Sequence, residues 1–423
     1  MSQDIRNGGG WAWFAALIVF ALPLRAVAPL GIGALTPGVL IAVLCLPAIG
    51  ATAMQFPRAK TLGALCVGAG VSGLVLTEFA KSDHSVTRGI TQSTTLLIVC
   101  AGITFLALLW ATTKIGVSYT VLAFCSGSIG QAFLTSAAWA GNGWKYAFSW
   151  PVAIAILVLV RNRPKLYQVA ALAVIAALSI LNDYRSFFGF ALLLAVALMA
   201  PRLRGRTAPA KALAIGPMVA LGALGYAIYR ASEWLALNGY MGTRNADITG
   251  IQSDRGVSLL LSGRPEWAAT VSLFFERPLG YGPGVVPSMS DEAVGKEGLR
   301  KVDAPTNTEY VDEYMFGDHF ELHSILADFW VNFGMIGLVL GVLSAWLIAH
   351  RLATEFVAPK PRAWVMLVLL VGVWDLAFSP IQSNWTHWVL ALAVAVSLCG
   401  RNGASRTPTR SAPSESPSHV MVQ

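Results

Sequence analysis

The stretch that decides the fold begins SGRPEWAATVSLFFERPLGYGPG at Ser262 and closes HSILADFWVNFGMIGLVLG, from His323 to Gly341. Between these two segments the chain is acidic, and after His323 the polar loop turns into an apolar run of helix length. Most of the chain before Ser262 consists of apolar runs long enough to cross a bilayer. We therefore expect a series of spans that hold this loop over one face of a membrane.

The composition is that of an all-α polytopic membrane protein. Hydrophobic residues make up 55% of the 423 residues and charged residues 12%, and the mean hydropathy is +0.61. These values exclude an ordinary soluble domain. The five cysteines all lie inside apolar runs, which favours neither a disulfide framework nor a thiolate metal site.

We predict about twelve transmembrane helices, with one long loop before the last three. The expected spans are residues 11–29, 34–54, 61–79, 91–111, 115–137, 146–160, 166–181, 184–200, 212–233, 324–349, 362–380 and 383–399. They divide the chain into an N-terminal bundle (1–233), a large outer loop (234–322) and a C-terminal group of three spans (323–399). The tail (400–423) is rich in Ser, Pro and Arg and is expected to be disordered.

The distribution of positive charge sets the expected orientation. Sixteen Lys and Arg residues fall in connections on the side of the N-terminus and in the tail, whereas the short connections on the other side hold four, Lys81, Arg88, Lys145 and Arg185. Cytoplasmic connections carry the excess of Lys and Arg. Both termini are therefore expected in the cytoplasm, with the long loop outside.

We single out seven ionisable residues in or at the ends of the predicted spans, where a charge costs at least a few kcal/mol without a partner or a polar cavity. They are Arg25, Glu78, Asp183, Arg185, Arg230, Glu233 and Asp375. On the predicted topology all seven lie in the outer half or at the outer end of their helices. Snorkelling and local ion pairing explain single members. Their shared side favours a polar cavity that opens outward beneath the long loop.

The first segment of the loop predicts a helix and then a tight turn. Pro265 suits the first turn of a helix, and the helix should end near Arg277-Pro278. An apolar stripe at helical spacing, expected to pack against the membrane surface, comprises Trp267, Ala268, Val271, Phe274 and Phe275. The glycines Gly280, Gly282 and Gly284 then permit a tight backbone turn.

His323 opens the return into the membrane, and it has three interpretations. It is an interfacial cap, a neutral imidazole that acts as a general base near pH 7, or part of a metal site. The residues of the metal interpretation are Asp318, His319, Glu321 and His323. In HFELH the glutamate lies two residues after the first histidine, off the shared helical face, so the sequence disfavours zinc. A structural calcium ion in the acidic loop stays open.

Together these features resemble the O-antigen ligase and polymerase superfamily of bacterial surface-polysaccharide enzymes. The resemblance rests on Arg264 followed by fifteen residues and Gly280, on His323-Ser324 ahead of Gly334 and Gly337, and on Arg185-Ser186 at the start of an earlier span. It covers most of the chain as architecture and about ninety residues as motif. The family's earlier motif more often reads Ser-Arg-Gly, and Tyr184-Arg185-Ser186 departs from it.

The resemblance implies a GT-C-like fold and a glycosyltransferase in the bacterial inner membrane. Its donor is a glycan on undecaprenyl diphosphate, and its acceptor is a hydroxyl of a lipid or a glycan, for ligation to lipid A-core or for chain polymerisation. The implied catalytic residues are His323, Arg264 and Arg185. The implied substrate-binding residues are Arg277, Gly280, Gly282, Asp183 and Arg230.

The residue chemistry suits that reaction without a cofactor or a metal. Arginine offers a fixed fork of donors to a diphosphate and keeps its charge, so Arg185 and Arg264 can stabilise the leaving group. The expected partners are the lipid-linked donor, the acceptor and membrane lipids, with no nucleic acid, and contacts with other polysaccharide-assembly proteins stay open. A flippase for lipid-linked glycans is the alternative, although it would need charges through both halves of the membrane. A non-catalytic scaffold would not need Arg264 or His323.

Overall fold

A computed structural model describes residues 9–28, 33–136, 141–199, 215–239, 250 and 264–400 of the chain. Over these ranges the chain is helical and forms no strand, only an isolated antiparallel bridge between Val86 and Val285. The prediction of an all-α fold is confirmed. The predicted disordered tail and the loop residues 240–249 and 251–263 lie outside the described residues.

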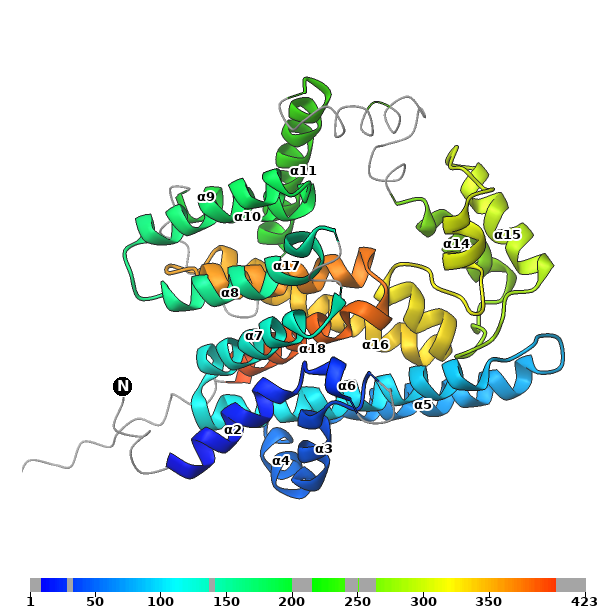
Figure 1. Cartoon of the computed structure of the whole chain (residues 1–423), viewed down its shortest axis with the longest axis horizontal. Helices are drawn as coiled ribbons and strands as arrows, with labels where there is room; N and C mark the ends of the chain where they lie inside the picture. The colour runs from blue at the N-terminus through cyan, green and yellow to red at the C-terminus, as the bar shows by residue number, and fades with distance from the viewer. Residues whose placement is uncertain are drawn as a thin grey trace, which may run out of the picture.

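A bundle of apolar helices makes up most of the molecule (Figure 1). Its members are α2 (Gly9–Ala21), α3 (Pro37–Leu44), α4 (Leu46–Ala53), α5 (Ala59–Ala80), α6 (Arg88–Ile115), α7 (Val117–Phe133), α8 (Ser149–Leu159), α9 (Lys165–Leu181), α10 (Arg185–Met199), α11 (Ile215–Leu237), α16 (Ile325–Phe356), α17 (Ala363–Phe378) and α18 (Ile381–Gly400). Within the described ranges α5, α6 and α16 are each long and apolar enough to cross a membrane. Shorter apolar helices accompany them, and the chain is a membrane-embedded protein.

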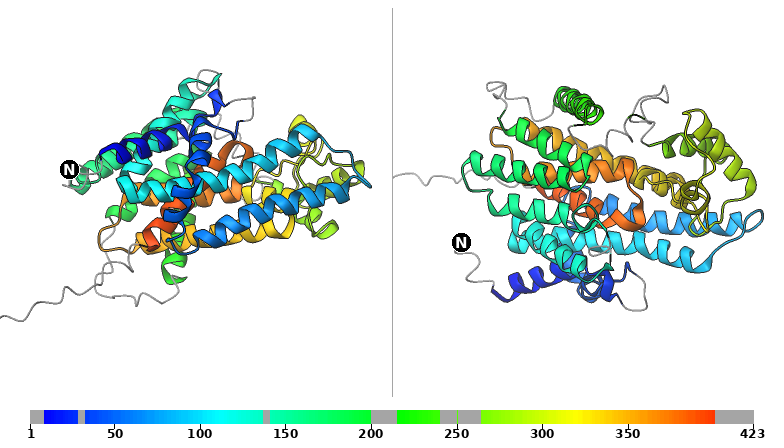
Figure 2. Two further views of the ribbon diagram at one scale, coloured as in Figure 1. Left: turned by 90° about the horizontal axis from the view of Figure 1, so that it is seen from below. Right: turned by 45° about the horizontal axis from the view of Figure 1, so that its top comes forward.

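Three predicted spans differ from the helices that form. The span at 34–54 is two eight-residue helices, α3 and α4, that meet at Cys45, because Pro47 cannot donate the next helical hydrogen bond. The span at 11–29 ends at Ala21, just before Pro23. The span at 212–233 forms α11, which runs across the direction of the other helices (Figures 1 and 2).

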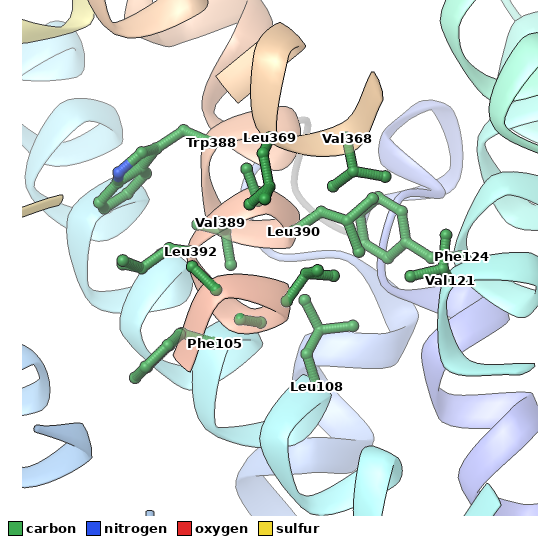
Figure 3. Packing of buried hydrophobic residues seen from close by; sticks show 14 of the residues in the cluster. Phe105, Leu108, Val121, Phe124, Val368, Leu369, Trp388, Val389, Leu390 and Leu392 are labelled. Atoms are coloured by element: carbon green, nitrogen blue, oxygen red, sulfur yellow. The ribbon is translucent and has the colours of Figure 1, made fainter. Parts of the chain in front are cut away.

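The bundle is held together by one large apolar core. Figure 3 shows part of it, where side chains of α6 and α7 meet those of α17 and α18. Phe105, Phe124 and Trp388 are among the largest side chains that are fully buried there. Residues separated by nearly 300 positions in the chain therefore pack into one unit, which sets the C-terminal helices firmly against the N-terminal ones.

The described part of the loop forms a small unit of its own on this bundle. It contains α14 (Glu266–Glu276), α15 (Met289–Arg300) and a π-helical turn, Tyr310–Met315. These elements share a separate apolar core with the start of α16. Figure 2 shows α14 and α15 beside the turn that joins α5 and α6. We call this end of the bundle the loop end.

The apolar stripe of α14 packs differently from the expectation of a face against the membrane surface. The Trp267 indole Nε1 donates to the Ala377 carbonyl oxygen at 2.8 Å, and Phe274 contacts Trp330 of α16. Val271 and Phe275 remain 49% and 78% exposed. The helix begins and ends as predicted, with Arg277 as its C-cap. One part of its stripe therefore anchors the loop unit to the bundle, while another part is uncovered.

Glycines decide how the loop unit meets α16. Gly334 has φ 64° and ψ −150°, so α16 is interrupted there instead of running straight past Gly334 as expected. The backbone N–H groups of Tyr281 and Gly282 both donate to the Val331 carbonyl at 2.9 Å. A Cβ at Gly280 would lie 2.5 Å from the Trp330 carbonyl oxygen. The sequence assigned Gly280 and Gly282 to substrate binding, and the structure gives both a role in close backbone packing.

Candidate functional site

Arg264 lies against the last turn of α17. Its guanidinium carbon is 5.9 Å from the ring centroid of Trp374 and 5.8 Å from that of Phe378. Cations are attracted to the faces of such rings, and the planar guanidinium also packs on them. The bond from Trp267 to Ala377 fixes the start of α14 over the same turn. Arg264 is therefore positioned at the loop end of α17 although it precedes that helix by about a hundred residues.

His323 lies immediately before α16 in an unusual backbone conformation, with φ 51°. Its Nδ1 is 3.4 Å from the Glu321 carbonyl oxygen, and its Nε2 is 3.9 Å from the Glu321 carboxylate. Ser324, not His323, is the N-cap, because its hydroxyl accepts from the Ala327 N–H at 3.3 Å. The interpretation of His323 itself as the cap is therefore wrong. His323 is the residue before the N-cap of α16.

Two contacts hold the residues around His323 against the same end of the bundle. The Ser324 hydroxyl donates to the Leu376 carbonyl at 2.9 Å, between the two α17 rings that contact Arg264. Asp328 is fully buried, and its carboxylate accepts from the Leu322 N–H at 3.0 Å and from the Ile381 N–H at 2.8 Å. Arg264 and Ser324, the neighbour of His323, thus contact the same turn at the loop end of α17.

Tyr310 connects these two residues. Its ring centroid is 5.1 Å from that of His323, and its hydroxyl donates to the carboxylate of Glu266, two residues after Arg264. Burial, and then the charge and the hydrogen bond of Glu266, raise the pKa of Tyr310 above its ordinary value, and the nearby Arg264 opposes this. The phenol therefore stays protonated at neutral pH and acts as a donor.

The turn before α10 reaches this region through Tyr184. Tyr184 lies within electrostatic range of both Arg264 and Asp375. Asp183 has φ 52°, and its carboxylate lies close enough to Arg185 to favour the charge of that guanidinium. Arg185 is half-buried at the start of α10. Asp183 and Arg185 thus form a charged turn, and Tyr184 between them stacks on Phe187 within electrostatic range of Arg264.

The other two predicted arginines have ion-pair partners. The Nη1 atom of Arg277 donates to the Asp83 carboxylate at 2.9 Å, and its guanidinium carbon lies 5.1 Å from the Tyr281 ring centroid. Arg230 pairs with Glu233 at 2.6 Å on the same face of α11, and its side chain is 59% exposed. Both contacts account for these arginines without a substrate.

A metal site is not assembled around HFELH in the described residues. His319 Nδ1 is 2.7 Å from the Asp318 carboxylate, but its Nε2 is 3.7 Å from Glu321. No group of three His, Cys, Asp or Glu side chains in the described ranges could hold an ion. The four residues instead pair with one another at the edge of the site.

A polar cluster, which we call the loop latch, ties the loop unit to the turn between α5 and α6. It consists of Asp83, His84, Arg277, Tyr281 and Asp291. The buried His84 ring bridges two carboxylates, with Nδ1 2.9 Å from Asp83 and Nε2 2.8 Å from Asp291. The Tyr281 hydroxyl donates to Asp291 at 3.0 Å. The latch therefore links residues more than 200 positions apart.

Both carboxyl groups of the latch titrate at low pH. The hydrogen bond from His84 and the charge of Arg277 lower the pKa of Asp83 against a smaller effect of burial. Burial raises the pKa of Asp291. Hydrogen bonds from Ser288, His84 and Tyr281 outweigh that effect, so the pKa of Asp291 is lowered overall. Both groups thus stabilise the folded protein above the ordinary carboxyl pKa, and that stabilisation is lost as the pH falls through the folded-state pKa.

We accordingly expect acid to release the loop unit before the bundle unfolds. Hydrogen-exchange protection factors of residues 264–322 should fall as the pH decreases from about 4 to about 2, below the ordinary carboxyl pKa, while those of α6 and α18 stay constant. In Asp291→Asn the protection should be lower at pH 5 and should change less with pH. Equal protection of wild-type 264–322 at both pH values would contradict this role of the latch.

A groove of about 730 Å³ lies elsewhere, between α14 and α15. Its walls include Trp267, Phe275 and Val294, and neither Arg264 nor His323 lines it. The groove is mostly apolar, whereas a diphosphate needs charged donors. We therefore place the candidate site at the loop end of α17 and not in this groove.

Sequence reasoning missed three residues of this site, Glu266, Tyr310 and Asp328. Asp328 was inside a predicted span, where an ionisable residue is a functional signal in itself. Glu266 and Tyr310 lie 44 positions apart in an acidic loop, and nothing in their local sequence distinguishes them from its other acidic and aromatic residues.

Searches against protein family models, curated proteins and solved structures find no match to this chain.

Proposed function

We propose that the protein is a glycosyltransferase of the O-antigen ligase type, which moves a glycan from undecaprenyl diphosphate to an acceptor hydroxyl. One observation carries the proposal: Arg264, an anion-binding group, lies on the last turn of α17, His323 adjoins Ser324 on the same turn, and both have Tyr310 as a neighbour. A guanidinium and an imidazole in one place are what the transfer of a glycosyl group from a diphosphate requires.

The reaction assigns a step to each residue. The acceptor oxygen attacks the anomeric carbon and forms the new glycosidic bond, and the bond from that carbon to the phosphate oxygen breaks. The leaving diphosphate takes the electron pair, and Arg264 stabilises its growing charge through paired N–H donors. His323 takes the proton of the acceptor hydroxyl. Arg185 is assigned to the same diphosphate, from the turn before α10, because the neighbouring Tyr184 lies within electrostatic range of Arg264.

The finer topology belongs to the same proposal. We propose about twelve spans in a GT-C-like arrangement, both termini in the cytoplasm, and the loop end on the outer face of the bacterial inner membrane. The positions of Arg264 and His323 at one end of the bundle fit a donor whose isoprenoid chain stays in the bilayer while its diphosphate reaches the membrane surface.

Purified protein in lipid nanodiscs tests the function directly. We expect it to release undecaprenyl diphosphate from an undecaprenyl-diphosphate oligosaccharide and to join the glycan to a lipid A-core acceptor or to a second lipid-linked repeat unit. Mass spectrometry of both products measures this, and the acceptor that reacts separates ligation from polymerisation. Translocation of the intact donor across a vesicle membrane, without cleavage, would instead support a flippase.

A further inference from the structure

Glu266 carries a buried carboxylate oxygen that no described side chain or backbone group satisfies. The residue is 6% exposed, and one of its oxygens, Oε1, accepts from Tyr310. The other oxygen, Oε2, is buried and has no hydrogen-bond partner within the described structure. An unpaired buried acceptor of this kind costs on the order of 1–3 kcal/mol, and more for a charged group. A bound ligand that donates a hydrogen bond to this oxygen would remove that cost.

The position of this oxygen places it in the candidate site. Glu266 is the first residue of α14 and lies two positions after Arg264. The Tyr310 ring that holds it lies 5.1 Å from the His323 ring, centroid to centroid. Arg264 and Glu321 are both within electrostatic range of Tyr310. Glu266 is therefore joined through Tyr310 to the surroundings of both groups that the proposed transfer uses.

The chemistry of a carboxylate oxygen determines which ligand group can bind to it. A diphosphate is an anion and offers acceptors at neutral pH, so Glu266 repels it. A carbohydrate hydroxyl donates one hydrogen bond, and a bond to a charged acceptor is about twice as strong as a neutral one. Tyr310 keeps its proton and is already directed to Oε1, so it fixes the carboxylate without competing for Oε2. A hydroxyl donor next to His323 belongs to the acceptor, whose attacking oxygen must lie there.

We propose that Glu266, oriented by Tyr310, forms a subsite that binds a hydroxyl group of the acceptor glycan. This inference rests on the proposed glycosyl transfer. It adds that Glu266, in the loop unit, contacts the acceptor substrate. Arg264 binds the diphosphate of the donor, whereas Glu266, two residues later, binds the acceptor. The two neighbouring charges thereby separate the two substrates.

The test is the full-length Glu266→Gln variant in nanodiscs, with the undecaprenyl-diphosphate oligosaccharide as donor and a soluble core oligosaccharide or repeat-unit glycan as acceptor. The amide keeps the size of the side chain and one oxygen for Tyr310, but it places an N–H₂ donor where the acceptor hydroxyl would donate. We expect the KM for the acceptor to rise by roughly tenfold or more, which is about 1.4 kcal/mol, while the KM for the donor stays unchanged. Tyr310→Phe, which keeps the ring beside His323, should shift the acceptor KM in the same direction by a smaller factor.

Glu276→Gln is the matched control, because Glu276 is the exposed last residue of the same helix. It should leave both KM values unchanged. Acceptor binding to wild type and Glu266→Gln, measured by saturation-transfer NMR without donor, gives a second readout if turnover is lost. An unchanged acceptor KM and unchanged binding in Glu266→Gln would overturn the subsite, and so would an equal shift in the donor KM. Absence of transfer by the wild type would instead overturn the proposed function.

Discussion

Arg264→Gln is expected to lower the turnover of donor by ~10²–10³-fold, the usual loss when one preorganised donor to a developing negative charge is removed. Glutamine retains polarity, but its side chain is shorter and lacks the positive charge and the fork of parallel N–H donors. Arg264→Lys should recover only part of the rate, because a lysine keeps the charge without the bidentate geometry. The measurement is single-turnover release of undecaprenyl diphosphate at saturating acceptor.

The control for Arg264 is Arg300→Gln in α15, in the same loop unit. Arg300 is 59% exposed and forms a surface pair with Glu297 at 3.1 Å. Such exposed pairs contribute little, so turnover and melting temperature should not change. If Arg264→Gln retained wild-type turnover, or if both variants lost the same fraction of activity, the role of Arg264 in binding the diphosphate would be wrong.

The sequence indicated the components of the site but not their arrangement. Arg264 and His323 were singled out because the motifs around them resemble those of the O-antigen ligase and polymerase superfamily. Their proximity depends on α17, which contributes Trp374 and Phe378 on one side and the Leu376 carbonyl on the other. Since no local pattern in α17 reports these contacts, only the packed structure brings the two residues together.

The helical nature of the fold was predictable because apolar periodicity and length are strong signals, and α14 began and ended where Pro265 and Arg277 indicated. The breaks were harder to foresee. Gly334 reads as a small residue within a helix, but it has a positive φ where the segment before Gly280 approaches it, and a Cβ at Gly334 would lie 2.6 Å from the Leu279 carbonyl oxygen. That approach is a tertiary contact between segments more than 50 positions apart.

Buried polar partners were the other omission. Asp328 is surrounded by apolar residues in ILADFWV, and its two backbone donors come from Leu322 and from Ile381 in another helix. The sequence indicates that such a buried carboxylate needs hydrogen-bond donors. Here the donors are backbone N–H groups, which have no sequence signature. The same limit applies to Glu266, whose partner Tyr310 lies across the loop unit.

His323→Asn is expected to lower turnover by ~10²–10⁴-fold, the range that a positioned general base contributes. Asparagine is the suitable replacement because His323 has φ 51°, a conformation that asparagine adopts more readily than most residues. The turn before α16, the Ser324 cap and the bonds to Asp328 should therefore remain, and the variant should melt like the wild type. What is lost is the ring nitrogen that accepts the acceptor's proton.

The sequence provides a matched control for this base in HFELH itself. His319→Asn removes the other histidine of the pair, whose Nδ1 is bonded to Asp318, and it should leave turnover within about twofold. Added imidazole should restore part of the rate in His323→Asn only, because the small base can occupy the space that the ring has vacated. A His323→Asn protein with full turnover would show that the proton goes to another group and that His323 serves only the backbone turn.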